Sequence, residues 1–460
     1  AFAELRLGIR TTADDFIVQD NDKLGDGTYV TGLRLVMGML IVQRNVAMGL
    51  LEVSLPAVSM NGNEQPANIT GNVTIFLNAA MVSASFGNND NPSTLVIGGA
   101  VSVTDNVLLD TLLMATLTHV GAVGVLCERN ALAVLRMDRL SRVVGPEGVL
   151  VRNNTIVPSQ NNTAATAGDA VIGRSLETDF DVVVEESHRF RTAFLSVAFV
   201  AGSVRVQNNG DLSGGCAVVS VVNITGNLTI RDNNWLERVQ ALQTPLAVVL
   251  VRGVGVDRDD QAISDPIGEI GGHVNVSNNT VVASFSMAGI VAVGQEFAVI
   301  DNESLQNVTA RSLSTVGAYV WVQFNPVLDT LLMGDLLDAG RDVNVTENGD
   351  GSSGRPLRAA GVVDFGQLDT VGLDVEGEGF DLVRSDSFET LDIAKIRLCG
   401  IGGGSDFRVV QNMQLAGTLY VEAFERSDTI LVHQNPVLEH MLIQGANLSL
   451  PLVDSVCVTE

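Results

Sequence analysis

The sequence predicts an all-β fold, a right-handed parallel β-helix or solenoid built from coils of about 23 or 24 residues. One observation behind this prediction is an asparagine that returns at that interval behind the frame apolar–x–apolar–x–x–Asn. The other is the alternation of apolar and polar residues before each asparagine, which is typical of a strand with one buried face. The asparagines in this frame are Asn21, Asn45, Asn78, Asn106, Asn130, Asn154, Asn209, Asn233, Asn279, Asn302, Asn325, Asn348, Asn412 and Asn435.

The coil around residues 226–236 shows how one repeat builds its strand. Leu228 and Ile230 alternate with Thr229 and Arg231, and a glycine before them allows a tight bend. Asn233 then ends the strand. We expect its amide to turn inward and to hydrogen-bond the backbone of the bend and of the neighbouring coil. Repeated in every coil, this contact predicts a ladder of stacked asparagines.

Apolar residues return three and six positions after the asparagine, as at Leu305 and Val308 or Leu328 and Leu331. Each coil therefore sends about four side chains inward, too few to offset the entropy lost when a single coil becomes ordered. Stacked coils share one core, so many coils are needed. No helical pattern of 10–12 residues interrupts them, and a coil of this length is too short for a strand plus a full helix.

Changes in the repeat suggest how the chain is organised. We expect an N-terminal solenoid lobe at residues 1–155 and an irregular insertion at 156–200 that holds one degenerate coil. In that coil Ser187 occupies the asparagine position. Residues 201–460 form the predicted C-terminal lobe, with a loop insertion at 349–379. We expect the lobes to make one continuous stack.

Composition limits the partners and the compartment. The 460 residues carry a net charge of −26, and lysine occurs only at Lys23 and Lys395. So acidic a chain repels nucleic acid, which argues against a DNA- or RNA-binding role. No apolar run reaches the ~18 residues that span a bilayer. Because the chain begins at Ala1, we expect a processed or partial product whose anchor, if any, lies outside it.

Glycosylation motifs favour an extracellular or cell-surface location. The motif Asn-x-Ser/Thr, which marks N-glycosylation acceptors, occurs at twelve positions of the chain. One of them, Asn302, holds the inward ladder position, and we expect it to be unmodified. Asn72, Asn227, Asn275 and Asn344 fall on outward strand positions in the repeat frame, where a glycan has room. The candidate N-glycosylation sites are Asn68, Asn72, Asn153, Asn161, Asn223, Asn227, Asn275, Asn278, Asn307, Asn344 and Asn447.

The repeat resembles that of the receptor L-domain family, whose leucine-rich-repeat-like coils follow Gly-x-Leu-x-Ile-x-x-Asn-x-x-Leu-x-x-Leu. Residues 226–239 and 317–331 carry this resemblance, and it extends from about Phe16 to Met441. The family includes the ligand-binding lobes of insulin- and EGF-type receptors and glycosylated cell-wall proteins of fungi. The resemblance implies a surface glycoprotein. The cysteine-rich modules that flank the receptor lobes are missing here, which favours a wall or surface protein over a receptor ectodomain.

No catalytic or metal site, and no cofactor, is predicted. Polysaccharide-active β-helices need carboxylates that converge on an outward sheet, and Glu128 is the only carboxylate on the outward frame positions. None of the histidines has ligand spacing. Cys127 occupies an inward strand position, where a buried, inert thiol is expected. The pairing of Cys127, Cys216, Cys399 and Cys457 is left open by the sequence.

Large apolar residues on outward strand positions predict a covered face. A column of them suggests contact with a loop, a lobe, another copy of the chain or a surface or matrix protein. The candidate interface residues are Leu126, Leu150, Tyr319, Trp321 and Leu431.

These observations favour an extracellular, glycosylated β-solenoid that serves as a structural or adhesive module of a cell surface, wall or filament, without catalysis. It would act by associating with other copies or with other surface proteins. A ligand-binding receptor ectodomain is the first alternative, and a polysaccharide-active β-helix enzyme is the second.

Overall fold

The computed structural model contains β-strands and no helix among the residues that it describes. Those residues are 2–8, 11–22, 24–54, 66–87, 94–154, 168–210, 215–233, 247–253, 268–280, 282–349, 361–365, 367–368, 370–371, 379–383, 388–392, 398–399, 406–412, 415–424, 426–435, 438–445 and 452–459.

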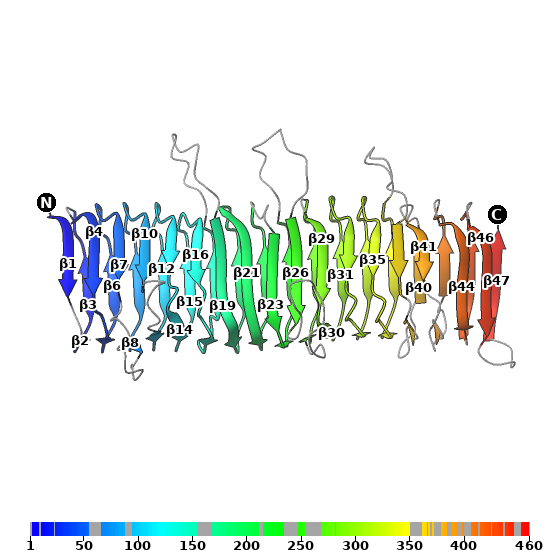
Figure 1. Ribbon diagram of the computed structural model, residues 1–460, viewed down its shortest axis with the longest axis horizontal. Coiled ribbons are helices and arrows are strands. Elements are labelled where there is room, and N and C mark those ends of the chain that lie inside the picture. The colour runs from blue at the N-terminus through cyan, green and yellow to red at the C-terminus, as the bar shows by residue number, and fades with distance from the viewer. Residues whose placement is uncertain are drawn as a thin grey trace, which may run out of the picture. The chain divides into compact units, whose positions relative to one another are not determined.

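The described residues form two compact units, the first ending at Ser220 and the second beginning at Val221. Each unit is a parallel β-solenoid, in which successive coils pair strand to strand (Figure 1). The predicted fold class is confirmed in both units. Whether the units continue one stack stays a prediction.

One sheet of unit one, which we name the ladder sheet, consists of the strands that end just before each repeated asparagine. Phe16 pairs with Leu40, and Leu40 pairs with Val73, so equivalent frame positions lie side by side in neighbouring coils. Buried and partly exposed residues alternate along these strands, as the period of two predicts. The strands are β3 (Phe16–Gln19), β6 (Leu40–Gln43), β9 (Val73–Phe76), β12 (Val101–Thr104), β15 (Val125–Glu128), β18 (Val149–Arg152), β20 (Val182–Glu185) and β22 (Val204–Gln207).

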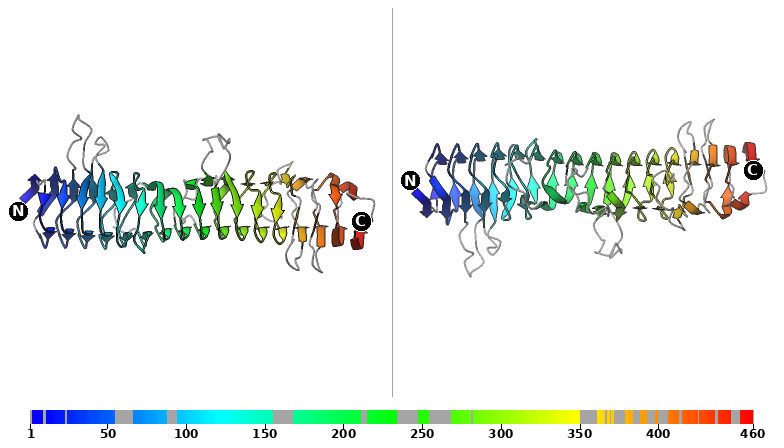
Figure 2. Two further views of the ribbon diagram at one scale, coloured as in Figure 1. Left: turned by 90° about the horizontal axis from the view of Figure 1, so that it is seen from below. Right: turned by 90° about the horizontal axis from the view of Figure 1, so that it is seen from above.

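Two further sheets close the coils of unit one, and Figure 2 shows its strands on opposite faces of the stack. The second sheet contains β1 (Phe2–Gly8), β4 (Leu24–Thr31), β7 (Leu50–Val53), β10 (Ser83–Phe86), β13 (Thr111–Leu113), β16 (Val134–Met137), β19 (Gly168–Thr178), β21 (Phe190–Val200) and β23 (Gly215–Val221). The third contains β2 (Thr11–Thr12), β5 (Leu35–Val36), β8 (Ala67–Ile69), β11 (Leu95–Ile97), β14 (Leu117–Val120), β17 (Arg142–Val143) and the ends of β19 and β21.

Unit two repeats this plan. Its ladder sheet contains β25 (Leu228–Arg231), β28 (Val274–Ser277), β31 (Phe297–Ile300), β34 (Val320–Gln323), β37 (Val343–Thr346), β40 (Gly379–Val383), β43 (Asp406–Val410), β45 (Arg426–His433) and β47 (Leu452–Thr459).

The second sheet of unit two contains β26 (Ala247–Gly253), β29 (Val282–Ala288), β32 (Asn307–Thr309), β35 (Thr330–Leu332), β38 (Gly361–Asp364) and β41 (Phe388–Asp392), with β44 (Gly417–Phe424) and β46 (Leu438–Gly445) as a separate pair. The third contains β24 (Asn223–Ile224), β27 (Gly268–Ile270), β30 (Ile290–Val293), β33 (Thr315–Val316), β36 (Asp338–Ala339), β39 (Thr370–Val371) and β42 (Leu398–Cys399).

The core of each coil comes from the inward strand residues and from the apolar residues that follow the asparagine. Leu305, Val308, Leu328 and Leu331, predicted from their spacing, are all fully buried. Neighbouring parallel strands lie ~4.8 Å apart, so each inward side chain packs on its equivalents in the coils before and after it.

The asparagine ladder is confirmed in each unit. Asn302 shows its geometry: its Oδ1 accepts the backbone N–H of Asn279 at 3.2 Å and the Nδ2 of Asn279 at 3.0 Å. The Nδ2 of Asn302 donates to the carbonyl oxygens of Val276 and Ile300 at 3.0 and 3.1 Å, and also to Asn325. Each buried amide thus satisfies backbone groups at a bend, where an unmade hydrogen bond costs about 1–3 kcal/mol.

Ser187 takes the place of asparagine in the degenerate coil, as predicted. Its backbone N–H donates to Oδ1 of Asn209 at 3.0 Å, and Nδ2 of Asn154 lies 3.5 Å from its hydroxyl oxygen. The shorter side chain therefore keeps the ladder connected by weaker contacts.

The residue directly before each ladder position has a left-handed backbone conformation, with φ between 50° and 59°. This corner turns the chain out of the ladder sheet and points the next side chain, the asparagine, inward. Residues other than glycine rarely adopt this backbone conformation. The corner residues are Asp20, Arg44, Leu77, Asp105, Arg129, Asn153, Glu186 and Asn208 in unit one, and Asp232, Asn278, Asp301, Phe324, Glu347, Gln411 and Gln434 in unit two.

Residues 168–200 of the insertion predicted at 156–200 are not irregular, because β19, β20 and β21 continue the parallel pairing there, and the coil at Ser187 is the degenerate coil that was predicted. Alternating apolar residues in these strands fill the same inward positions as in regular coils, although the glycine and asparagine signals are weak. The loop insertion predicted at 349–379 likewise includes β38 and β39, and its other long stretches lie outside the described residues.

Candidate partner-binding surfaces

Corner residues of neighbouring coils pair with one another in unit one. Arg44 donates from Nε and Nη2 to the two carboxylate oxygens of Asp20, at 2.6 and 2.8 Å. Arg129 binds Asp105 in the same way and at the same distances. These hydrogen bonds from arginine lower the pKa of Asp20 and of Asp105. An acidic corner is thus matched by a guanidinium one coil later.

In unit two, no arginine follows an aspartate at the described corner positions. The corner carboxylate of Asp232 accepts a hydrogen bond from Nδ2 of Asn278, which is the corner residue of the next coil in its sheet. At Asp301 the pairing stops, because the next coil places Phe324 at the corner and a phenyl ring has no hydrogen to donate. Among the residues that the structure describes, the Asp301 carboxylate has no hydrogen-bond or ion-pair partner.

A groove of about 600 Å³ lies at this corner of unit two, and we name it the corner groove. It runs across the coils of β28, β31 and β34, and its lining includes Asn278, Ile300, Asp301, Glu303, Phe324 and Pro326. Phe324 is 43% exposed. Within the described part of the chain, Glu303 is also without an ion-pair partner. The groove combines two available carboxylates with an aromatic ring.

The candidate interface residues Leu126 and Leu150 lie side by side on the outer face of the ladder sheet of unit one. They pair in register between β15 and β18, and Leu150 pairs in turn with Val183. Both leucines are partly exposed. Leu431, in unit two, is also partly exposed and pairs in register with Arg408 on one side and Cys457 on the other.

Tyr319 and Trp321 form an aromatic cluster in unit two, with ring centroids 4.9 Å apart. The guanidinium carbon of Arg341 lies 5.2 Å from the centre of the Tyr319 ring, and its Nη1 donates to the tyrosine hydroxyl at 2.6 Å. Trp321 is partly exposed between Ala298 and Asn344 in the neighbouring strands. The predicted interface residues are therefore partly exposed, with Leu126 and Leu150 in unit one and Tyr319, Trp321 and Leu431 in unit two.

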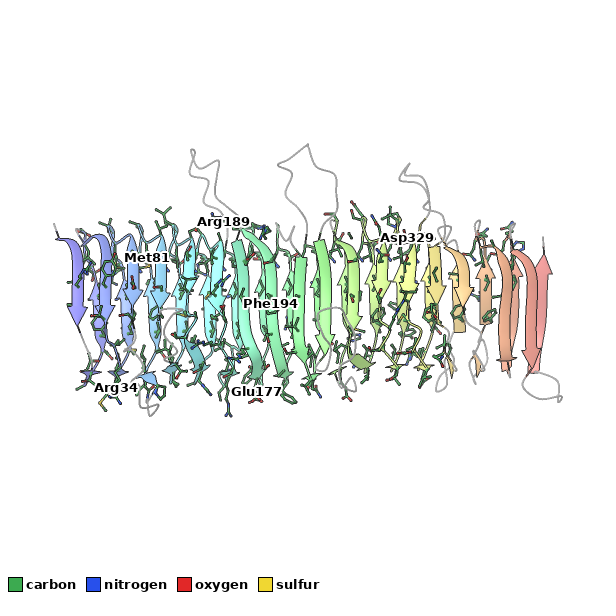
Figure 3. All side chains as sticks on the ribbon, viewed as in Figure 1. Arg34, Met81, Glu177, Arg189, Phe194 and Asp329 are labelled. Atoms are coloured by element: carbon green, nitrogen blue, oxygen red, sulfur yellow. The ribbon has the colours of Figure 1, made fainter. Side chains whose placement is uncertain are left out.

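Glu128 and Arg189 are largely buried charged side chains of the kind found in catalytic sites, but both are held in ion pairs. Glu128 is 8% exposed, and its Oε1 lies 2.8 Å from Nη1 of Arg129 and 3.1 Å from Nε of Arg152. Arg189, labelled in Figure 3, is 8% exposed and binds Asp110 at 2.7 Å. Both groups stabilise the stack by bridging coils.

The predicted glycosylation sites have different surroundings. Asn275 and Asn344 lie within strands β28 and β37 at outward positions, as expected. The Oδ1 atom of each is nevertheless buried, and it has no hydrogen-bond partner among the described residues. Asn72 and Asn227 instead lie just before their strands, where Oδ1 accepts a backbone N–H of the next coil. Their placement on strands was wrong, because the strand begins one residue later.

Other sequons fall on corners, on short strands or outside the structure. Asn153 and Asn278 are left-handed corner residues, while Asn68, Asn223 and Asn307 lie on the short strands β8, β24 and β32. Asn302 is fully buried in the ladder. Asn161 and Asn447 lie outside the described residues.

Cys127 and Cys216 are free, buried thiols. Burial raises the pKa of each to about 12, so both stay protonated at neutral pH. Cys127 thus matches its predicted role. Among the described residues, no group of three or more His, Cys, Asp or Glu side chains is arranged to hold a metal ion. A search of the same residues finds no helix long and apolar enough to cross a membrane.

The fold and these surfaces define the chain as a parallel β-solenoid with an asparagine ladder, partly exposed apolar residues on its ladder sheets, an aromatic pair and an acidic groove. Comparison with protein-family models, curated proteins and solved structures finds no match.

Sequence reasoning missed the corner groove. The signal was the residue directly before each asparagine: Asp20 is followed one coil later by Arg44, and Asp105 by Arg129, whereas Asp301 is followed by Phe324. Reading that column across coils would have singled out Asp301.

Proposed function

We propose that this chain is an extracellular, glycosylated structural or adhesive module that acts by association with other copies or with surface proteins, without catalysis. Support comes from the outward row of Leu126 and Leu150, which lie in register on a flat parallel sheet and keep apolar area in contact with water. Burial of such area against a partner is favourable by about 25 cal/mol per Å². The likeness of the repeat to the receptor L-domain family points the same way.

Sedimentation velocity and negative-stain imaging of the purified chain test the association. The double variant Leu126→Ser/Leu150→Ser is expected to weaken association by at least about tenfold, because two outward leucines leave the contact. Val123→Ser/Val144→Ser is a matched control, since these exposed valines lie at another corner of the same unit. A wild-type chain that stays monomeric, or equal effects of both variants, contradicts self-association through this row.

Mass spectrometry before and after enzymatic glycan removal tests the extracellular part of the proposal. Secreted from eukaryotic cells, the chain is expected to lose mass, with occupied sites at exposed positions such as Asn227 and none at buried Asn302. Unchanged mass contradicts the glycoprotein proposal.

A ligand-binding receptor ectodomain is the second candidate, and the cluster of Tyr319, Trp321 and Arg341 favours it. Aromatic rings beside a guanidinium are enriched at sites of recognition. This candidate expects a monomer, and it expects Trp321→Ala to abolish ligand binding without changing sedimentation.

A further inference from the structure

We propose that the corner groove of unit two binds an arginine side chain presented by a basic segment of a partner protein. The inference rests on the proposed association function and adds the chemistry of the partner and the site that receives it.

The corners that carry an aspartate have equivalent backbone conformations. Asp20, Asp105 and Asp301 each lie directly before a ladder asparagine, with φ of 57°, 59° and 55°. Their next-coil neighbours Arg44 and Phe324 have φ of 54° and 55°. Strands one coil apart are separated by ~4.8 Å, so each aspartate presents its carboxylate beside the next corner side chain in the same geometry.

The chain itself places a guanidinium beside two of these corner carboxylates. Asp20 and Asp105 each receive a two-point hydrogen bond from a guanidinium, with both distances between 2.6 and 2.8 Å. Two parallel N–H donors match the two oxygens of a carboxylate, which makes this arrangement the strongest of the charged pairs. Asp301 offers the same acceptor without the guanidinium.

The corner groove has space and further groups for such a guanidinium. Its volume of about 600 Å³ holds a long side chain, and Glu303 supplies a second exposed carboxylate with no ion pair in the described part of the chain. Phe324, 43% exposed, offers a ring face to a cation, which is attracted within about 6 Å of the ring centre. Ile300 and Pro326 supply apolar contact for the methylene stem.

The net charge of the chain indicates which kind of molecule carries the arginine. The chain has a net charge of −26, so two copies repel one another while a basic partner is attracted. Charge complementarity therefore favours a basic partner over a second copy. The overall charge attracts the basic partner, and Asp301 in the corner groove provides the specific contact for its arginine.

The test is fluorescence anisotropy of the whole chain with a short labelled peptide of alternating arginine and glycine. Asp301→Asn/Glu303→Gln is expected to weaken binding by about tenfold, because both acceptor charges are lost while size is kept. Glu269→Gln/Asp335→Asn removes the same charge from exposed positions in the same unit and is expected to change binding less than about twofold.

A lysine–glycine peptide of equal length supplies the second readout. It is expected to bind about threefold more weakly than the arginine peptide to the wild type, because an ammonium cannot make the two-point contact. The groove variant is expected to remove this preference. The proposal is overturned if both charge variants lose peptide affinity equally, or if the wild type binds both peptides with equal affinity. Either result would show that the peptide is held by the overall negative charge and not by the groove.

A second copy as the occupant is distinguished by sedimentation. If the groove variant changes self-association but not peptide binding, the proposed occupant is wrong. Failure of the glycan or leucine experiments leaves the peptide result unaffected, so the two proposals fail separately.

Discussion

At the scale of single residues, the ladder amides contribute most to the specificity of the fold. Each buried asparagine joins its own coil to the coils before and after it through both its oxygen and its nitrogen. An amide is the smallest side chain that carries an acceptor and two donors on one rigid group. Aspartate at this position would be a buried charge, and leucine would leave the bend unsatisfied.

Asn302→Ala is expected to destabilise unit two by about 3 kcal/mol. The change leaves the N–H and Nδ2 of Asn279 without their acceptor and the carbonyls of Val276 and Ile300 without a donor. The urea midpoint followed by circular dichroism measures the loss. Asn307→Ala, an asparagine on a short strand outside the ladder, is the control, and a similar loss there would contradict the special role of the ladder.

The sequence predicts the ladder residues because two independent signals coincide, the 23- or 24-residue interval and the type of side chain. It does not predict the corners, because Asp20, Arg44, Leu77 and Phe324 share a backbone conformation but no chemistry. The groove is harder still, since it depends on side chains from three separate coils.

At the scale of elements, the parallel register restricts the bends as strictly as the strands. Gly294, Gly317 and Gly340 stack at one bend of unit two, and a Cβ on Gly317 would lie 2.1 Å from the carbonyl oxygen of Gly294. Backbone meets backbone there, so the neighbouring coil has no flexible atom that can move aside. At Gly317 the spacing of the coils thus leaves no room for a side chain.

Gly317→Ala is expected to cost about 3 kcal/mol, because the new methyl group forces neighbouring coils apart. Thermal unfolding followed by circular dichroism checks this change. Gly334→Ala is the matched control in the same unit, since its Cβ would meet first a carboxylate oxygen of Asp364 at 3.0 Å, on a side chain that can rotate. Equal losses in the two variants would contradict the role of the close backbone approach at Gly317.

At the scale of the whole molecule, charge opposes the association that the outward apolar rows favour. A net charge of −26 keeps copies apart at neutral pH, and the sequence pI is about 4.4. Basic partners experience the opposite force. Association is therefore expected to depend on pH and salt even though the contacts themselves are apolar.

Lowering the pH from 7 to about 4.4 is expected to increase self-association in sedimentation, while the strand signal in circular dichroism persists. The folded-state pKa values of Asp20 and Asp105 lie below the ordinary value of 3.8. Their stabilising contribution is therefore present above pH 3.8 and is lost as the pH falls through the lowered values. Loss of strand signal before pH 4.4, or association that ignores pH, contradicts this expectation.

The constant spacing of the ladder has a consequence for how such a chain can change length. Asn279, Asn302, Asn325 and Asn348 follow one another at 23 residues and make interchangeable contacts. Excising one full period rejoins an equivalent donor to an equivalent acceptor, so the shortened protein keeps its interior. Removing a single residue from within a strand instead turns the rest of that strand's side chains to the opposite face. Between strands the chain accepts extra residues, since Asn45 still contacts Asn78 at a spacing of 33 residues and Asn78 contacts Asn106 at 28. A change of length is therefore tolerated as a whole coil or as a loop between strands.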